Sequence, residues 1–109
     1  RNNVGRILAE MENFSSNNSG QYPNESADQS DQLSLAYFTN EYLAGIASLQ
    51  DPQTMELNLS SKTPVAVGEI QYRLGFQCDG QRIILGRSNR SIMVRVLLEP
   101  GEMYCQDNS

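Results

Sequence analysis

Cys78 and Cys105, the only two cysteines, carry the most distinctive chemistry in this chain of 109 residues. The chain has no histidine, so two thiols cannot complete a closed zinc site of nitrogen and sulfur ligands. The same absence excludes a Ser-His or Cys-His nucleophile pair. In a reducing compartment two distant cysteines stay free, whereas in a small exported domain they pair. Both interpretations remain open at this point.

The carboxylates provide a second set of reactive groups. Asp79 and Asp107 each lie within two residues of a cysteine and would approach one another if the cysteines paired. Carboxylate oxygens bind Ca²⁺, which makes these two residues candidate calcium ligands. Glu10 and Glu12 point in different directions on a helix and are expected to face solvent rather than form an acid–base pair. Without a phosphate-binding or dinucleotide motif, the sequence predicts neither an enzyme nor a cofactor.

Length and charge narrow the class of protein further. A chain of this length is expected to form one domain. Its net charge of −5 and isoelectric point near 4.5 oppose general nucleic-acid binding. The late arginines are interpreted as solvent-facing positions on strands and turns; they are Arg82, Arg87, Arg90 and Arg95. No run of apolar residues approaches the roughly 20 that a membrane helix needs, and no signal peptide is recognised.

The chain begins with an amphipathic segment, and the rest of the domain is expected to pack around it. Its apolar residues recur with the helical period, and they are Val4, Ile7, Leu8, Met11 and Phe14. This stripe predicts a helix over 1–14, ended by the Ser, Asn and Gly residues of 15–20. No clear capping residue precedes it. A helix with a defined end and no defined start is expected to be the lower half of a longer one.

Aromatic residues are expected to hold the following segment in place. The polar stretch 15–30 needs an anchor, and Tyr22 beside Pro23 is the natural one. Phe38 and Tyr42 stand four residues apart and can pair on a helix.

A second helix is predicted over 31–48, capped by Ser30 or Asp31 and broken near Thr39–Asn40. The Asp-Pro pair that follows ends it. Residues 53–66 are expected to be irregular, with a brief edge strand over 55–59.

The last third alternates apolar and polar residues with the period of strands. Strands are predicted over 69–76, 82–86 and 92–98, and Asp79-Gly80 predicts a hairpin between the first two. Apolar residues on both faces towards the end of 92–98 indicate that this strand is well covered there. The three strands are expected to form one antiparallel meander. A bond between the cysteines would further require the tail to run back along the sheet.

Three segments together resemble the globular domain of type IV pilins and related pseudopilins. They are the helix end with NNSGQYP, the stretch YLAGIASLQDPQT and the closing run RVLLEPGEMYC. The resemblance implies an α+β fold in which the N-terminal helix packs on a small antiparallel meander of three to four strands. It divides the single domain 1–109 into the end of a long helix over 1–14, a connecting region over 15–66 with a short helix, and a sheet region over 67–109.

The resemblance also implies a function and a set of partners. Cys78 and Cys105 would form the C-terminal disulfide, and the chain would be a structural subunit of an extracellular bacterial pilus serving attachment and twitching motility. An apolar helical segment ahead of residue 1 would anchor it in the inner membrane before assembly. Its partners would be other pilin subunits, packed in part through the apolar stripe, the inner-membrane assembly machinery, and a host-cell or abiotic surface. Two alternatives remain: a pseudopilin of a secretion system, which calcium binding would favour, and a freestanding secreted adhesin.

Overall fold

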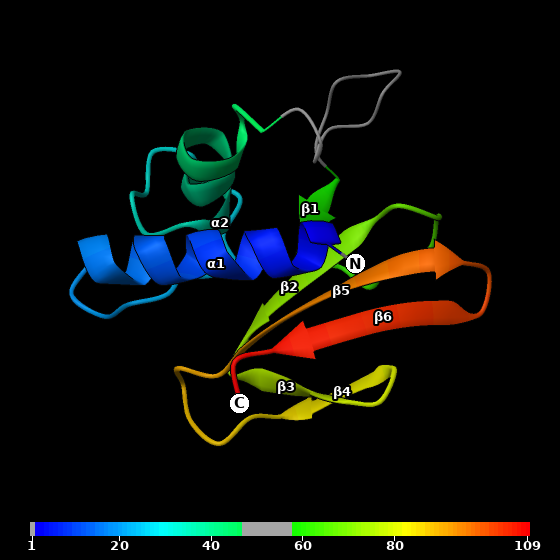
Figure 1. Cartoon of the computed structure of the whole chain (residues 1–109). Coiled ribbons are helices and arrows are strands. Elements are labelled where there is room, and N and C mark those ends of the chain that lie inside the picture. The colour runs from blue at the N-terminus through cyan, green and yellow to red at the C-terminus, as the bar shows by residue number, and fades with distance from the viewer. Residues whose placement is uncertain (1, 47–57) are drawn as a thin grey trace.

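The computed structural model describes residues 2–46 and 58–109, which form an α+β fold in three layers. The helix α1 (Asn2–Asn17) lies across one face of a four-stranded sheet, and a two-stranded hairpin lies beyond the other face (Figure 1). The sheet has the order β1 (Leu59–Ser60), β2 (Ile70–Leu74), β5 (Ile92–Glu99), β6 (Glu102–Asp107). The hairpin consists of β3 (Phe76–Asp79) and β4 (Arg82–Leu85).

The amphipathic stripe of α1 forms the centre of the core. Val4, Ile7, Met11 and Phe14 are fully buried, and Leu8 is almost so. They pack with the sheet residues Ile70, Tyr72, Ile92 and Val94 and with the second helix. The helix continues to Asn17, slightly beyond the predicted end. The chain leaves it through Ser19 and Gly20, which both adopt positive φ, and the Gly20 N–H donates to the Ser15 carbonyl at 2.8 Å.

The second helix is shorter than its pattern predicts. It begins at Leu35 as α2 (Leu35–Phe38), and its N-cap is Ser34 rather than Ser30 or Asp31. The Ser34 hydroxyl accepts from the Tyr37 N–H at 2.9 Å. At Thr39, where the sequence predicts a break, the helix continues but widens into the π-helical turn η1 (Thr39–Leu43). The predicted segment 47–48 lies outside the described residues.

The predicted three-stranded meander is wrong. β2 ends at Leu74, Gly75 turns the chain away with a φ of 86°, and residues 76–85 form the separate β3–β4 hairpin. β2 therefore pairs directly with β5, with Tyr72 opposite Val94. The predicted edge strand is displaced to Leu59–Ser60, where β1 pairs in parallel with β2; residues 55–57 of that prediction lie outside the described residues.

β5 is covered on both faces over its first half, whereas the sequence predicts cover towards its end. Ile92 and Val94 belong to the helix side, and Met93 and Arg95 lie on the hairpin side, where Arg95 donates to the Gln81 carbonyl; exposure increases towards Glu99. The tail runs back along the sheet as β6, antiparallel to β5, and this prediction is confirmed. No helix within the described parts of the chain is long and apolar enough to span a lipid bilayer.

The connection after α1 is fixed by aromatic residues. Tyr22 is half-buried, as an anchor should be, and Pro23 is buried with its carbonyl accepting from the Tyr72 hydroxyl at 2.6 Å. The predicted Phe38–Tyr42 pair is also present, with ring centroids 5.4 Å apart. Phe14 meets both rings edge-on, so this pair lies against α1.

Candidate functional site

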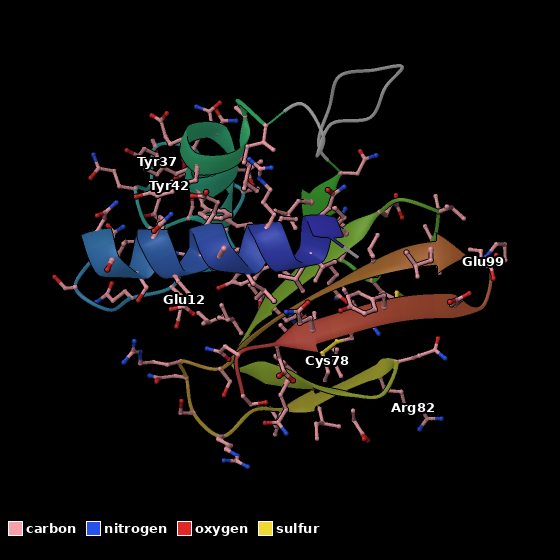
Figure 2. All side chains as sticks on the ribbon, in the orientation of Figure 1. Glu12, Tyr37, Tyr42, Cys78, Arg82 and Glu99 are labelled. Carbon is pink, nitrogen blue, oxygen red and sulfur yellow. A yellow bond between two sulfur atoms is a disulfide. The ribbon has the colours of Figure 1, made fainter. Side chains whose placement is uncertain are left out.

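The disulfide predicted by the pilin resemblance is present. Cys78 on β3 and Cys105 on β6 are bonded, with Cα atoms 5.9 Å apart (Figure 2). The bond fastens the hairpin to the last strand of the main sheet, and hydrogen bonds of Gln81 add further links. The Gln81 side chain accepts from the Met103 N–H at 2.8 Å, and the Gln81 carbonyl accepts from Arg95 at 3.2 Å.

The two candidate calcium ligands have different environments. The Asp107 carboxylate accepts from the Cys78 N–H at 2.6 Å and from the Ser109 N–H at 3.2 Å, so it already stabilises the disulfide region. Asp79 is exposed at the hairpin turn and faces Arg82 in the strand register. Within residues 2–46 and 58–109, no three His, Cys, Asp or Glu side chains group as metal ligands would. Calcium binding by Asp79 and Asp107 stays a prediction.

The structure uses the two faces of α1 differently. All five residues of the predicted packing stripe are buried against this domain's own sheet and second helix. The opposite face, which includes Arg6, Ala9, Asn13 and Ser16, is exposed. Contacts of α1 with another molecule would therefore involve this exposed face.

A buried polar pair supports the hairpin side of the sheet and was not recognised in the sequence. The Arg95 guanidinium donates to the Gln71 amide oxygen at 2.6 Å, and the Gln71 amide donates to the Ser61 carbonyl at 2.8 Å. Burial lowers the pKa of Arg95, and the nearby Arg73 guanidinium lowers it further. Arg95 is thus a structural residue rather than part of an exposed basic surface. The alternation of polar and apolar residues in β2 and β5 is the sequence signal that could have indicated that Gln71 and Arg95 lie on the same face of the sheet.

A second polar cluster joins α1 to the connection that follows it and to Arg90. The Tyr22 hydroxyl donates to the Glu12 carboxylate at 2.9 Å, and the Arg90 guanidinium lies 5.6 Å from the centre of the Tyr22 ring. Burial and the Glu12 hydrogen bond both raise the pKa of Tyr22. The hydrogen bond to Glu12 holds the start of the 18–34 connection against α1.

The hairpin exposes apolar and basic residues on both of its sides. Arg82 and Ile84 lie on one side of β4, Leu85 lies on the other, and Arg87 follows the strand. Leu85 is 77% exposed and Ile84 is 43% exposed, which is high for large apolar side chains. Arg82 points away from the main sheet (Figure 2), and neither it nor Arg87 forms an ion pair with any residue that the structure describes.

A groove lies on the other side of the molecule, between the second helix and β1, and we call it the helical groove. Its volume is about 570 Å³. Apolar side chains line much of it, among them Leu35, Leu43 and Leu59. Glu25, Asn40 and Lys62 add polar groups. The sequence does not predict this groove, because its walls come from elements far apart in the chain.

Comparisons with protein-family models, with curated proteins and with solved structures find no match to this chain.

Proposed function

We propose that this chain is a structural subunit of an extracellular filament of the type IV pilus class. The observation that carries the proposal is the arrangement of α1, which buries one face against its own sheet and leaves the other exposed. A helix fixed in this way can present its exposed face to neighbouring helices in a filament. An apolar helical segment ahead of α1 would bury itself at the filament axis, as a membrane helix buries itself in lipid.

Other features support the same assignment. A disulfide between the hairpin and the last strand suits a small domain that works outside the cell. The sheet is covered by α1 on one face and partly by the hairpin on the other, so the surface left for contacts with the surroundings is made by loops and by the hairpin. The proposed partners are other subunits, the inner-membrane assembly machinery, and the host-cell or abiotic surface to which the filament attaches.

The direct test expresses the chain with its natural upstream segment in a pilus-forming cell and measures its incorporation into sheared filaments. Ala9→Glu places a charge on the exposed face of α1 and should reduce incorporation while leaving the urea unfolding midpoint nearly unchanged. The matched control is Val65→Glu, which alters an exposed residue of a distant loop and should leave incorporation intact. An unmodified chain that never enters filaments, or an upstream gene sequence that encodes an ordinary cleaved secretion signal, would refute the proposal.

A further inference from the structure

We propose that a pocket between the connection after α1 and the turn before β5 binds a sugar that carries one carboxylate. The two segments lie at the end of the molecule where α1 ends (Figure 1). Gly20, Gln21 and Tyr22 line one side and Asn89 and Arg90 the other, and we call this site the Tyr22 pocket. Its volume is about 470 Å³, within the roughly 300–1,000 Å³ of small-molecule sites.

This inference deepens the proposed filament function, because it names the chemistry of the surface to which such a filament would attach. Only that role in attachment rests on the filament function. The binding itself depends on the pocket and is tested on the 109-residue chain alone.

Hydrogen bonds fix both walls of the Tyr22 pocket. On the first wall, the Asn24 N–H donates to the Leu33 carbonyl at 2.8 Å, which holds the connection after α1. On the second wall, the Asn108 side chain donates to the Arg90 carbonyl at 3.1 Å and accepts from the Ile92 N–H at 3.0 Å. The two walls are therefore ordered before a ligand arrives, which lowers the entropic cost of binding.

Arg90 supplies a positive charge that no described carboxylate neutralises. Its guanidinium lies 5.6 Å from the centre of the Tyr22 ring, and a Cβ atom at Gly20 would lie 3.6 Å from one of its nitrogens. The ring positions the guanidinium but offers no oxygen to its five N–H donors. Within the described residues, no Asp or Glu side chain forms an ion pair with it. A positioned, exposed guanidinium can bind an incoming carboxylate through two parallel hydrogen bonds.

The charges around the pocket favour a ligand with a single negative charge. Two carboxylates already bond residues that line it: Glu12 accepts from the Tyr22 hydroxyl at 2.9 Å, and Asp31 accepts from the Asn24 amide at 3.1 Å. The chain as a whole carries a net charge of −5. One guanidinium can balance one carboxylate in this setting, whereas a polyanion would be repelled.

The other lining groups suit the hydroxyl groups and the ring of a sugar. The side-chain amides of Gln21 and Asn89 are exposed and form no hydrogen bond with any residue that the structure describes. Each amide offers two donor hydrogens and an acceptor oxygen, and a hydroxyl group both donates and accepts. Leu33 and Leu74 add a small apolar area for ring carbons. A carboxylate and several hydroxyl groups on one small ring therefore match the pocket.

The first experiment titrates the isotope-labelled 109-residue chain with two acidic sugars, glucuronate and N-acetylneuraminate, and follows its NMR signals. At least one of them should shift the signals of residues 19–24 and 88–91 saturably at millimolar concentration. Glucose has the ring without the carboxylate, and acetate has the carboxylate without the ring, so each should bind several-fold more weakly. Equal binding of glucose or of acetate would overturn the ligand class. Saturable shifts centred on other residues, or none with either acidic sugar, would overturn the site.

The second experiment compares arginine variants in the same titration. Arg90→Gln should weaken binding of the acidic sugar about tenfold or more, because it removes a charge-assisted hydrogen bond. Arg90→Lys keeps the charge but not the planar fork and should fall between this variant and the parent. The matched control is Arg87→Gln, which changes an exposed arginine of the same turn outside the pocket and should leave the affinity unchanged. Equal affinities of the parent and Arg90→Gln would contradict the proposal.

Two further measurements separate the possible failures. The urea unfolding midpoints of these variants should match that of the parent, because both arginines are exposed, so lost binding would not reflect lost folding. A chain that enters filaments but binds neither acidic sugar refutes only the ligand of the pocket. A chain that binds the sugar but never enters filaments refutes the pilus function and leaves the site standing.

Discussion

Removal of the Cys78–Cys105 disulfide provides the sharpest test of how the hairpin is held. The bond closes a loop with a sequence separation of 27 residues. On the chain-entropy model a loop of this length stabilises the folded state by about 3.5 kcal/mol, because the crosslink restricts the unfolded chain. The double variant Cys78→Ala/Cys105→Ala should lose stability of that order.

The assay is equilibrium urea unfolding of the double variant and of the parent chain. For a domain of this size a loss of about 3.5 kcal/mol lowers the unfolding midpoint by roughly 1–3 M. Hydrogen exchange adds a local readout, because the polar bonds that remain between the hairpin and the sheet are few. Amides of β3 and β4 should lose more protection than those of β2 and β5.

Two results would refute this reasoning. A loss of stability below about 1 kcal/mol would show that the crosslink does not restrict the unfolded chain as the entropy model requires. A uniform loss of protection across all strands would show that the hairpin and the sheet open as one unit rather than separately. A matched comparison is the parent chain under reducing conditions, which should behave like the double variant because both lack the bond.

Further predictions concern single buried or crowded positions. Tyr72→Phe removes a buried hydrogen bond and should cost about 1–2 kcal/mol at neutral pH. Burial raises the pKa of Tyr72 above its ordinary value of 10.0, so above pH 10 only the unfolded state loses this proton. Above that pH the free energy of unfolding of the parent should therefore fall by about 1.4 kcal/mol more per pH unit than that of Tyr72→Phe. Gln71→Leu should cost about 1–3 kcal/mol, and adding Arg95→Met should recover part of it. Gly86→Ala should destabilise by about 1–3 kcal/mol, because its methyl would lie 2.3 Å from a neighbouring side-chain carbon. Gly45→Ala should not destabilise the protein, because the added methyl group would meet open space.

Urea unfolding at several pH values measures all of these variants. Equal slopes above pH 10 for the parent and Tyr72→Phe would show that Tyr72 ionises in the folded state. If the Arg95→Met substitution further destabilises Gln71→Leu, the two side chains are not coupled as the 2.6 Å hydrogen bond indicates. If Gly86→Ala and Gly45→Ala are equally stable, the close packing at Gly86 is relieved without cost.

Local patterns in the sequence were sufficient to predict the elements that bury a single face against one core. The period of Val4, Ile7, Leu8, Met11 and Phe14 predicted α1, because one helix face meets one core. The alternation along 92–98 predicted a strand, and the Asp79-Gly80 turn predicted the hairpin. The pairing of the cysteines came from the pilin resemblance, since spacing alone left free thiols possible.

The partners of each strand were decided only by the tertiary structure. Alternation along 69–76 cannot show that Gly75 turns the chain, so the pattern merged two strands that belong to different sheets. Once β3 leaves the sheet, β2 is free to pair with β5, and the hairpin covers the polar pair of Gln71 and Arg95. Side-chain periodicity records which face of a strand is buried, whereas strand order depends on long-range contacts that no local pattern contains.

The sequence by itself determined an acidic α+β domain built on an amphipathic first helix, with two cysteines and no histidine. Only the tertiary structure decided that the arginines of one cluster separate into a buried Arg95 and the exposed Arg82 and Arg87. It alone formed the helical groove, because Leu35 and Leu59 come from distant parts of the chain. Burial and surface shape depend on tertiary contacts between distant segments, and composition and periodicity do not specify those contacts.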